Sequence, residues 1–202
     1  MSRVEKDEIY DRYLTRAISE INELGDEIAR CAVPPHQAHQ PVIGSGHPLA
    51  DIFLLKHSPM PAELAEGVAF YGRVGQAVLK SVQRLGIDPL LLYGTNCVKY
   101  GDLDDEELKD SCPAWLVREL AIVQPKMVVV MGPDTLAFVN DLDLPLGRTL
   151  EPELGEIQKL TPTIEALYVP AIEESLDEQG AKRRFWDAFR SLGSWYEALP
   201  PY

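Results

Sequence analysis

The stretch Met127-Val128-Val129-Val130-Met131 (MVVVM) is the clearest strand in the chain, because a short unbroken apolar run is typical of a strand buried on both faces. Three further short apolar runs predict strands in the same way: Asp51–Leu55, Leu90–Thr95 and Leu167–Pro170. Segments with helical periodicity separate these runs. The alternation predicts an α/β fold, a three-layer α/β/α sandwich with a central, mainly parallel four-stranded sheet.

Apolar residues recur at three- and four-residue steps in the segments between and around the strands, which indicates amphipathic helices. The predicted helices cover residues 4–29, 72–85, 105–122, 133–142 and 180–192. No internal repeat is visible. We therefore expect one domain over residues 1–202, with an N-terminal helix at 4–29 and a C-terminal tail at 193–202.

Composition excludes several classes of protein. With 19 basic and 32 acidic residues, the chain has a net charge of −13, which is unfavourable for general nucleic-acid binding. No apolar run approaches the ~20 residues of a membrane span, and the N-terminus lacks the apolar core of a signal peptide. The three cysteines, Cys31, Cys97 and Cys112, are too few for a disulfide framework, so we expect a reduced, cytoplasmic protein.

Ligands of parallel α/β folds bind beyond the carboxyl ends of the strands, which directs attention to the residues that follow each predicted strand. The polar candidates there are His57, Asn96, Lys99, Glu173 and Glu174. The sequence contains no phosphate-binding loop, no G-x-S-x-G elbow and no H-E-x-x-H zinc motif. No set of Cys and His residues has the spacing of a metal site, so we expect no metal.

The segment Glu66–Gly75 (EGVAFYGRVG) places two glycines three residues apart at the start of a helix, directly after Phe70 and Tyr71. Such glycines let the backbone approach a flat ligand, with Phe70 as the stacking face. The same pattern is also typical of a turn with Phe70 in the core. Spacing alone leaves both interpretations open.

Residues 56–75 resemble the pattern G-E-A-P-G-x-x-E-D-x-x-G-x-P-F-V-G-x-A-G of the iron–sulfur (family 4) type of uracil-DNA glycosylase, with Pro59, Glu63, Gly67, Phe70, Gly72 and Gly75 in register. Later motifs of that family are similar to Thr95–Tyr100, Cys112–Leu116, Pro125–Gly132, Glu173–Ser175 and Phe185–Asp187. The resemblance covers roughly residues 20–190. It implies a hydrolase of DNA repair that acts by base excision, with uracil-containing single-stranded DNA or a free nucleobase as its partner.

The resemblance also assigns roles to residues. Phe70 would stack on the base and Asn96 would read its edge, with Ser58 and Tyr71 as further base-binding residues. The catalytic positions are His57, where the family has glutamate, and Glu173, where it has the histidine that stabilises the uracil anion. Lys56 and Met60 replace family glycines, and we expect their side chains to fill part of the pocket.

This exchange of acid and imidazole leaves three interpretations open. Glu173 could be protonated in an apolar pocket and donate a hydrogen bond to the base. Alternatively, the roles could be swapped, with His57 stabilising the anion and Glu173 acting as the base. In the third interpretation the site has drifted after activity was lost, and the protein acts as a protein-interaction or regulatory module.

The family's 4Fe–4S cluster needs four thiolate ligands. Only Cys31 and Cys112 fall on those positions, and the other two are Pro34 and Tyr100, so we expect no iron–sulfur cluster. The candidates for DNA contact are basic residues near the strand ends and the last helix, namely Lys56, Arg73, Lys99, Arg148 and Lys182–Arg184. Acidic residues in the same loops, Glu63 among them, predict a solvated acidic rim that repels phosphate.

Overall fold

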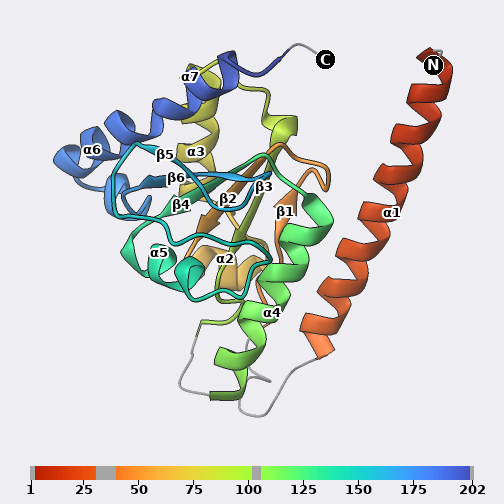
Figure 1. Cartoon of the computed structure of the whole chain (residues 1–202). Coiled ribbons are helices and arrows are strands. Elements are labelled where there is room, and N and C mark those ends of the chain that lie inside the picture. The colour runs from red at the N-terminus through yellow and green to blue at the C-terminus, as the bar shows by residue number, and fades with distance from the viewer. Residues whose placement is uncertain (1–2, 31–39, 102–105, 201–202) are drawn as a thin grey trace.

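The computed structural model describes residues 3–30, 40–101 and 106–200 and confirms the predicted α/β sandwich. The central sheet has the strand order β1-β3-β2-β4-β6-β5, shown in Figure 1. Its four inner strands are parallel and correspond to the four predicted runs. They are β2 (Ile52–Lys56), β3 (Leu92–Asn96), β4 (Met127–Met131) and β6 (Glu165–Val169).

The sheet has six strands rather than the predicted four, because a short strand pairs antiparallel with each edge of the parallel core. β1 (Ser45–Gly46) pairs with β3, and β5 (Ile157–Lys159) pairs with β6. Both are short and partly exposed, so neither contains the apolar run by which a buried strand is recognised.

Helices cover both faces of the sheet. They are α1 (Arg3–Arg30), α2 (Pro61–Glu66), α3 (Arg73–Arg84), α4 (Glu106–Val123), α5 (Pro133–Asn140), α6 (Gln179–Phe189) and α7 (Ser191–Glu197), with single 3-10 turns η2 (Pro89–Leu91) and η3 (Glu174–Leu176). The sequence predicted the five longer helices but neither α2 nor α7. Residues 193–197 of the expected tail lie in α7, where Trp195 is buried, and Tyr202 lies outside the described residues.

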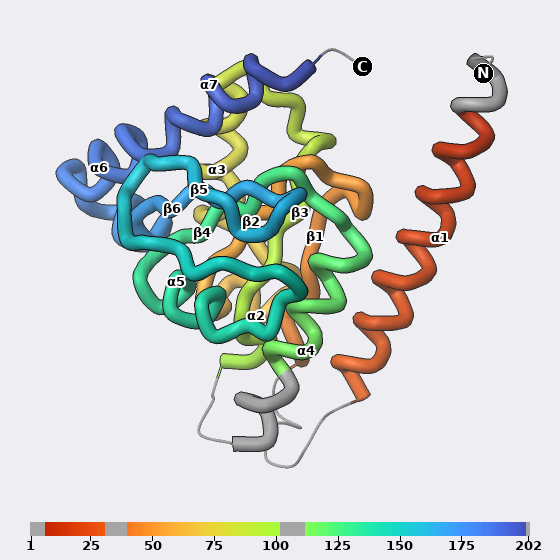
Figure 2. Tube along the Cα trace, viewed as in Figure 1, coloured from red at the N-terminus to blue at the C-terminus, as the bar shows by residue number. Residues whose placement is uncertain are grey.

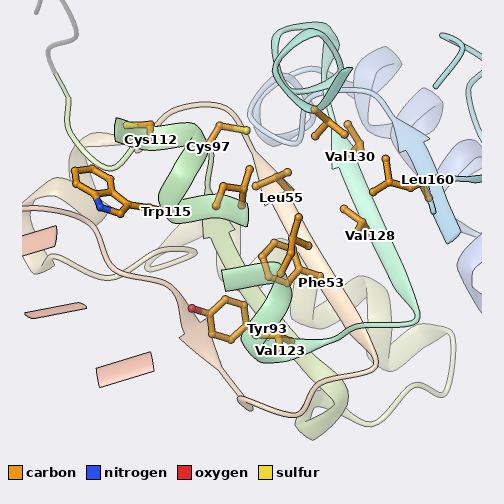
Figure 3. Close-up of a cluster of buried hydrophobic side chains, with 14 of the residues drawn as sticks. Phe53, Leu55, Tyr93, Cys97, Cys112, Trp115, Val123, Val128, Val130 and Leu160 are labelled. Carbon is orange, nitrogen blue, oxygen red and sulfur yellow. The ribbon is translucent and has the colours of Figure 1, made fainter. Parts of the chain in front are cut away.

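The alternation of side chains along the strands divides the core into two clusters. On one face Phe53, Leu55, Tyr93 and their neighbours pack against α1, α4 and α5, and Figure 3 shows part of this cluster. On the other face Ile52, Leu54, Leu92 and their neighbours pack against α3, α6 and α7. We call these the α4 face and the α3 face of the sheet.

Helix α1 runs beside α4 (Figure 2). Its buried side chains near the carboxyl end are Leu24 and Ile28, and Glu27 forms an ion pair with Arg118 of α4 at 2.6 Å. No helix in the described part of the chain is long and apolar enough to cross a membrane.

Candidate functional site

The order of the parallel strands reverses between β2 and β4, so the loops that follow these strands form the crevice where such folds bind ligands. The strands end at Lys56, Asn96, Met131 and Val169. In register, Lys56 pairs with Asn96 on one side and with Met131 on the other. The candidate residues of β2 and β3 therefore lie side by side at the same edge of the sheet.

Asn96 is the most unusual polar residue at this edge. Its side chain is fully buried, and neither its amide nitrogen nor its amide oxygen has a hydrogen-bond partner among the described residues. Leaving a buried amide unpaired costs on the order of 1–3 kcal/mol, so native proteins rarely contain one without a reason. An amide with one free donor and one free acceptor matches the edge of a pyrimidine.

The ring of Phe70 packs against Gly94 of β3, which lies two residues before Asn96 and so on the same face of the sheet. A Cβ atom at Gly94 would lie 2.6 Å from Cδ2 of Phe70, which shows that the ring packs directly over this glycine. Gly75 has a similar role, because a Cβ there would lie 1.8 Å from the carbonyl oxygen of Phe70. Phe70 itself has a φ of 57°, a strained value for a bulky side chain. Gly94 thus lets the Phe70 ring lie against β3, and Gly75 lets the Phe70 backbone lie against the first turn of α3.

Glu63 holds this loop in place. Its carboxylate is fully buried and accepts hydrogen bonds from the backbone N–H groups of Met60 (2.6 Å) and Phe70 (2.5 Å). The first of these bonds closes the start of α2. The expectation that Glu63 belongs to a solvated acidic rim is therefore wrong, because its carboxylate is enclosed by the loop that it organises.

Lys56 connects this loop to the loop after β6. Its side chain is fully buried, and Nζ lies 2.7 Å from Oε2 of Glu63 and 3.5 Å from Oε1 of Glu173. Nζ also donates to the carbonyl oxygen of Ser58 at 2.5 Å. The glutamate at position 173, whose side chain is 31% exposed, thus faces an ammonium group. Lys56 was a candidate for DNA contact on sequence grounds, and its burial in this cluster excludes that role.

His57 and Ser58 directly follow Lys56, the last residue of β2. His57 Nδ1 lies 2.7 Å from Ser58 Oγ, and the imidazole packs edge-on against Phe138 of α5. The histidine lines a cavity of about 370 Å³ together with Phe138 and Cys112, among others. Tyr71 is 49% exposed at the outer side of the Phe70 loop. In the described residues, Lys56 rather than His57 contacts Glu173.

A second buried ion pair lies on the α4 face. Lys99 Nζ is 2.6 Å from Glu119 Oε2 and donates to Thr95 Oγ1 at 2.5 Å, and Tyr93 donates to Glu119 Oε1 at 3.0 Å. Burial and the carboxylate of Glu119 raise the pKa of Tyr93, and burial raises the pKa of the thiol of Cys97. Lys99, like Lys56, is therefore unavailable to a phosphate, contrary to the expectation from its position after a strand.

The residues at the implied cluster positions do not fit an iron–sulfur cluster. Tyr100 is buried, and its hydroxyl donates to the carbonyl oxygen of Ile28 at 2.7 Å, so its ring occupies the space between α1 and the loop after β3. Cys112 is also buried, and Cys31 and Pro34 lie outside the described residues. Among the side chains that the structure describes, no group of three or more potential ligands could hold a metal ion.

Phe70, Asn96 and Glu173 stay predictions as site residues. The sequence also predicted that Lys56 fills part of the pocket, but it missed the pairing of Lys56 with Glu63. One signal was present for each. Lys56 directly follows the apolar residues of β2 and belongs to the same buried strand. Glu63 is the third residue of α2, the position at which a glutamate commonly completes a capping box. Their pairing depends on the fold of the intervening loop, so neither signal alone predicted the cluster.

Comparisons with known proteins agree with this geometry. The family model described as "Uracil DNA glycosylase superfamily" matches residues 43–190. A type-4 uracil-DNA glycosylase of Pyrobaculum aerophilum is 23% identical over 145 residues, 70% of this chain and 71% of that protein. Another of Sulfurisphaera tokodaii is 28% identical over 104 residues, 48% of this chain and about half (47%) of that protein's length. The chain therefore belongs to the uracil-DNA glycosylase superfamily, as a member similar to the type-4 enzymes.

Proposed function

We propose that this protein binds a uracil-like base at the carboxyl ends of β2 and β3 and hydrolyses the N-glycosidic bond that joins the base to deoxyribose in DNA. The observation that carries the proposal is the buried Asn96 amide, which has no partner among the described residues and lies two residues from Gly94, where the Phe70 ring packs. A pyrimidine stacked on Phe70 would give this amide the donor and acceptor that it lacks. Ser58 and Tyr71 would line the outer side of the base.

In the proposed reaction a water molecule attacks C1′ of the deoxyribose. The bond between C1′ and the base breaks, the base leaves with the electron pair, and the water loses a proton. Glu173 would accept this proton, and His57 would donate a hydrogen bond to the leaving base, the swapped assignment of the two roles. The contact with Lys56 supports this assignment, because Glu173 faces the ammonium group as a hydrogen-bond acceptor, the role that a group orienting the attacking water requires.

The proposal makes the protein a hydrolase of DNA repair, and it includes the cytoplasmic location expected from the cysteine content. The names of the relatives support the uracil-containing DNA substrate. The chemistry in this chain would need neither a metal nor a cluster.

A second function is supported by the same cluster. Lys56 pairs with both Glu63 and Glu173, and in the family pattern a glycine stands in place of Lys56. A site closed in this way suits a protein that kept the fold and acts through protein contacts instead of excision.

Strand cleavage at abasic sites distinguishes the two functions. The substrate is single-stranded DNA with one uracil, and the proteins are the parent, His57→Ala, Glu173→Ala and Glu173→His. Excision by the parent that is lost in both alanine variants would support the hydrolase. An inactive parent that becomes active only as Glu173→His would contradict the proposed roles and favour the second function.

A further inference from the structure

A small cavity lies between α3 and the sheet, on the α3 face. It encloses about 160 Å³. Leu92, the first residue of β3, lines the cavity, whereas Asn96, the last residue of that strand, does not. The cavity is therefore separate from the candidate base site. The residues of the sheet core and of α3 that line it are Leu54, Gly75, Val78, Leu79, Leu92 and Gly94.

The lining of this cavity is almost entirely apolar. None of the described residues that line it is charged, and Ser45 alone among them has a polar side chain. The Ser45 hydroxyl donates to the carbonyl oxygen of Ala69 at 2.8 Å, so it is already paired. A buried water molecule needs roughly two to four polar partners, and an apolar cavity without them stays dry. The lining therefore suits an apolar occupant.

Phe70 forms one wall of the cavity. Its ring packs over Gly94, where a Cβ atom would lie 2.6 Å from Cδ2 of the ring. Leu92, Gly94 and Asn96 lie on the same face of β3, so Gly94 stands between the leucine of the cavity and the candidate base-binding amide. An occupant of the cavity therefore contacts, from the side of Leu92, the same ring on which a base would stack.

The size and the opening of the cavity fit one small ring. An apolar protein cavity of about 150 Å³ stays dry and binds benzene or xenon. The present cavity has nearly that volume, and its side chains are mostly leucine, valine and phenylalanine. Leu79, which is 43% exposed, and the exposed Pro89 line it at the surface, so a ligand can enter from solvent.

We propose that this cavity binds one small uncharged apolar molecule, with the size and chemistry of a single aromatic hydrocarbon ring. The occupant packs against the Phe70 ring and holds it against Gly94. Binding in the cavity is independent of the proposed function, and only its consequence for a base rests on that function. A ring that is held in place loses less freedom when a base stacks on it, so an occupied cavity raises the affinity for uracil.

Benzene is the probe, and the full chain is titrated and followed by NMR. The methyl resonances of Leu54, Val78 and Leu92 and the ring resonances of Phe70 should shift and saturate together. Phenol has the same ring with a hydroxyl group, which the cavity would bury without a partner. Phenol should therefore bind at least about tenfold more weakly than benzene.

Two pairs of variants place the binding in this cavity. Val78→Ala enlarges the cavity and should raise the affinity for p-xylene relative to that for benzene, whereas Val74→Ala, also buried in α3 but outside the lining, should leave the ratio unchanged. Leu79→Trp puts a larger side chain at the opening and should weaken benzene binding about tenfold, because it takes the place of the ligand's contacts. Leu90→Trp is its matched control, at an exposed leucine that does not line the cavity.

The inference is overturned if benzene causes no saturable shifts in the parent, or if phenol binds as tightly as benzene. An equal p-xylene-to-benzene ratio in Val78→Ala and Val74→Ala would also overturn it. The affinity for uracil is measured with and without benzene. An unchanged affinity would contradict the effect on Phe70, whereas a parent that binds benzene but no uracil would contradict the proposed function and leave the cavity site standing.

Discussion

Thr95 and Asn96 are consecutive residues at the end of β3, and both are fully buried, yet their surroundings differ completely. Thr95 faces α4, where its hydroxyl accepts from Lys99 and donates to Glu119. Asn96 faces α3, where its amide has no partner among the described residues. The α4 face pairs these buried polar groups within the protein, whereas the α3 face leaves the Asn96 amide without a partner among the described residues. At the end of one strand, a buried polar side chain that is paired within the protein thus lies next to one that is not.

The largest effect is expected from breaking the buried ion pair of Lys99 and Glu119 on the α4 face. Lys99→Met should lower the free energy of unfolding in urea by about 3–5 kcal/mol, because it leaves the carboxylate of Glu119 buried without its cation. The double variant Lys99→Met/Glu119→Leu should recover most of the loss, since it removes both charges. A loss of stability below about 1 kcal/mol in Lys99→Met is what an exposed ion pair contributes, and it would contradict the structural role of this buried pair.

Substitution of Asn96 on the α3 face should change the free energy of unfolding in the opposite direction. Asn96→Leu keeps a similar volume and removes the unpaired amide, so it should raise the free energy of unfolding by about 1–3 kcal/mol. Asn140→Leu is the matched control, because that amide both donates to and accepts from the backbone of Leu150. The control should be less stable than the parent. If both variants were destabilised alike, Asn96 would be an ordinary structural amide.

The loop after β3 extends the comparison to Tyr100. Tyr100→Phe removes the hydrogen bond to the carbonyl oxygen of Ile28 and should cost about 0.5–1.5 kcal/mol. Hydrogen exchange should locate the loss in the last turns of α1. Tyr71→Phe, which changes a half-exposed side chain, should alter neither the free energy of unfolding nor the hydrogen exchange of α1. An equal effect of the two substitutions would show that the hydrogen bond of Tyr100 does not stabilise the protein.

The smallest effect is expected at the edge of the sheet. The hydrogen bond from Lys159, together with that from Trp195 of α7, lowers the pKa of Glu165. The stability that this carboxylate contributes is therefore complete above its ordinary pKa of 4.5 and is lost as the pH falls through the lowered value. The difference in melting temperature between the parent and Glu165→Gln should be present at neutral pH and shrink in acid. A difference independent of pH would contradict this.

Much of the fold could be predicted from the sequence, because the four parallel strands are apolar runs that need no knowledge of their neighbours. The predicted strand Leu90–Thr95 begins two residues early, since Pro89–Leu91 forms a 3-10 turn that Asp88 caps. The edge strands β1 and β5 were missed because they depend on pairing with β3 and β6 rather than on their own composition.

The sequence predicts a candidate site residue only where the type and position of that residue alone indicate its role. Phe70 and Asn96 were proposed as base-binding residues from their type and position, and that role stays a prediction. The roles of Lys56 and Lys99 were not, because a lysine after a strand is normally solvated and only the positions of Glu63 and Glu119 in the fold explain its burial. The pairing of Lys56 with Glu173 likewise depends on two loops that are far apart in sequence.

We propose that the Asn96 amide, which has no partner among the described residues, is left free on the α3 face to bind a base. This claim is tested most directly by titrating uracil into the parent, Asn96→Leu and Asn140→Leu and following binding by calorimetry or protein NMR. We predict saturable binding by the parent and by Asn140→Leu, and none by Asn96→Leu although that variant is the most stable of the three. Binding of uracil by Asn96→Leu with the affinity of the parent would contradict the account.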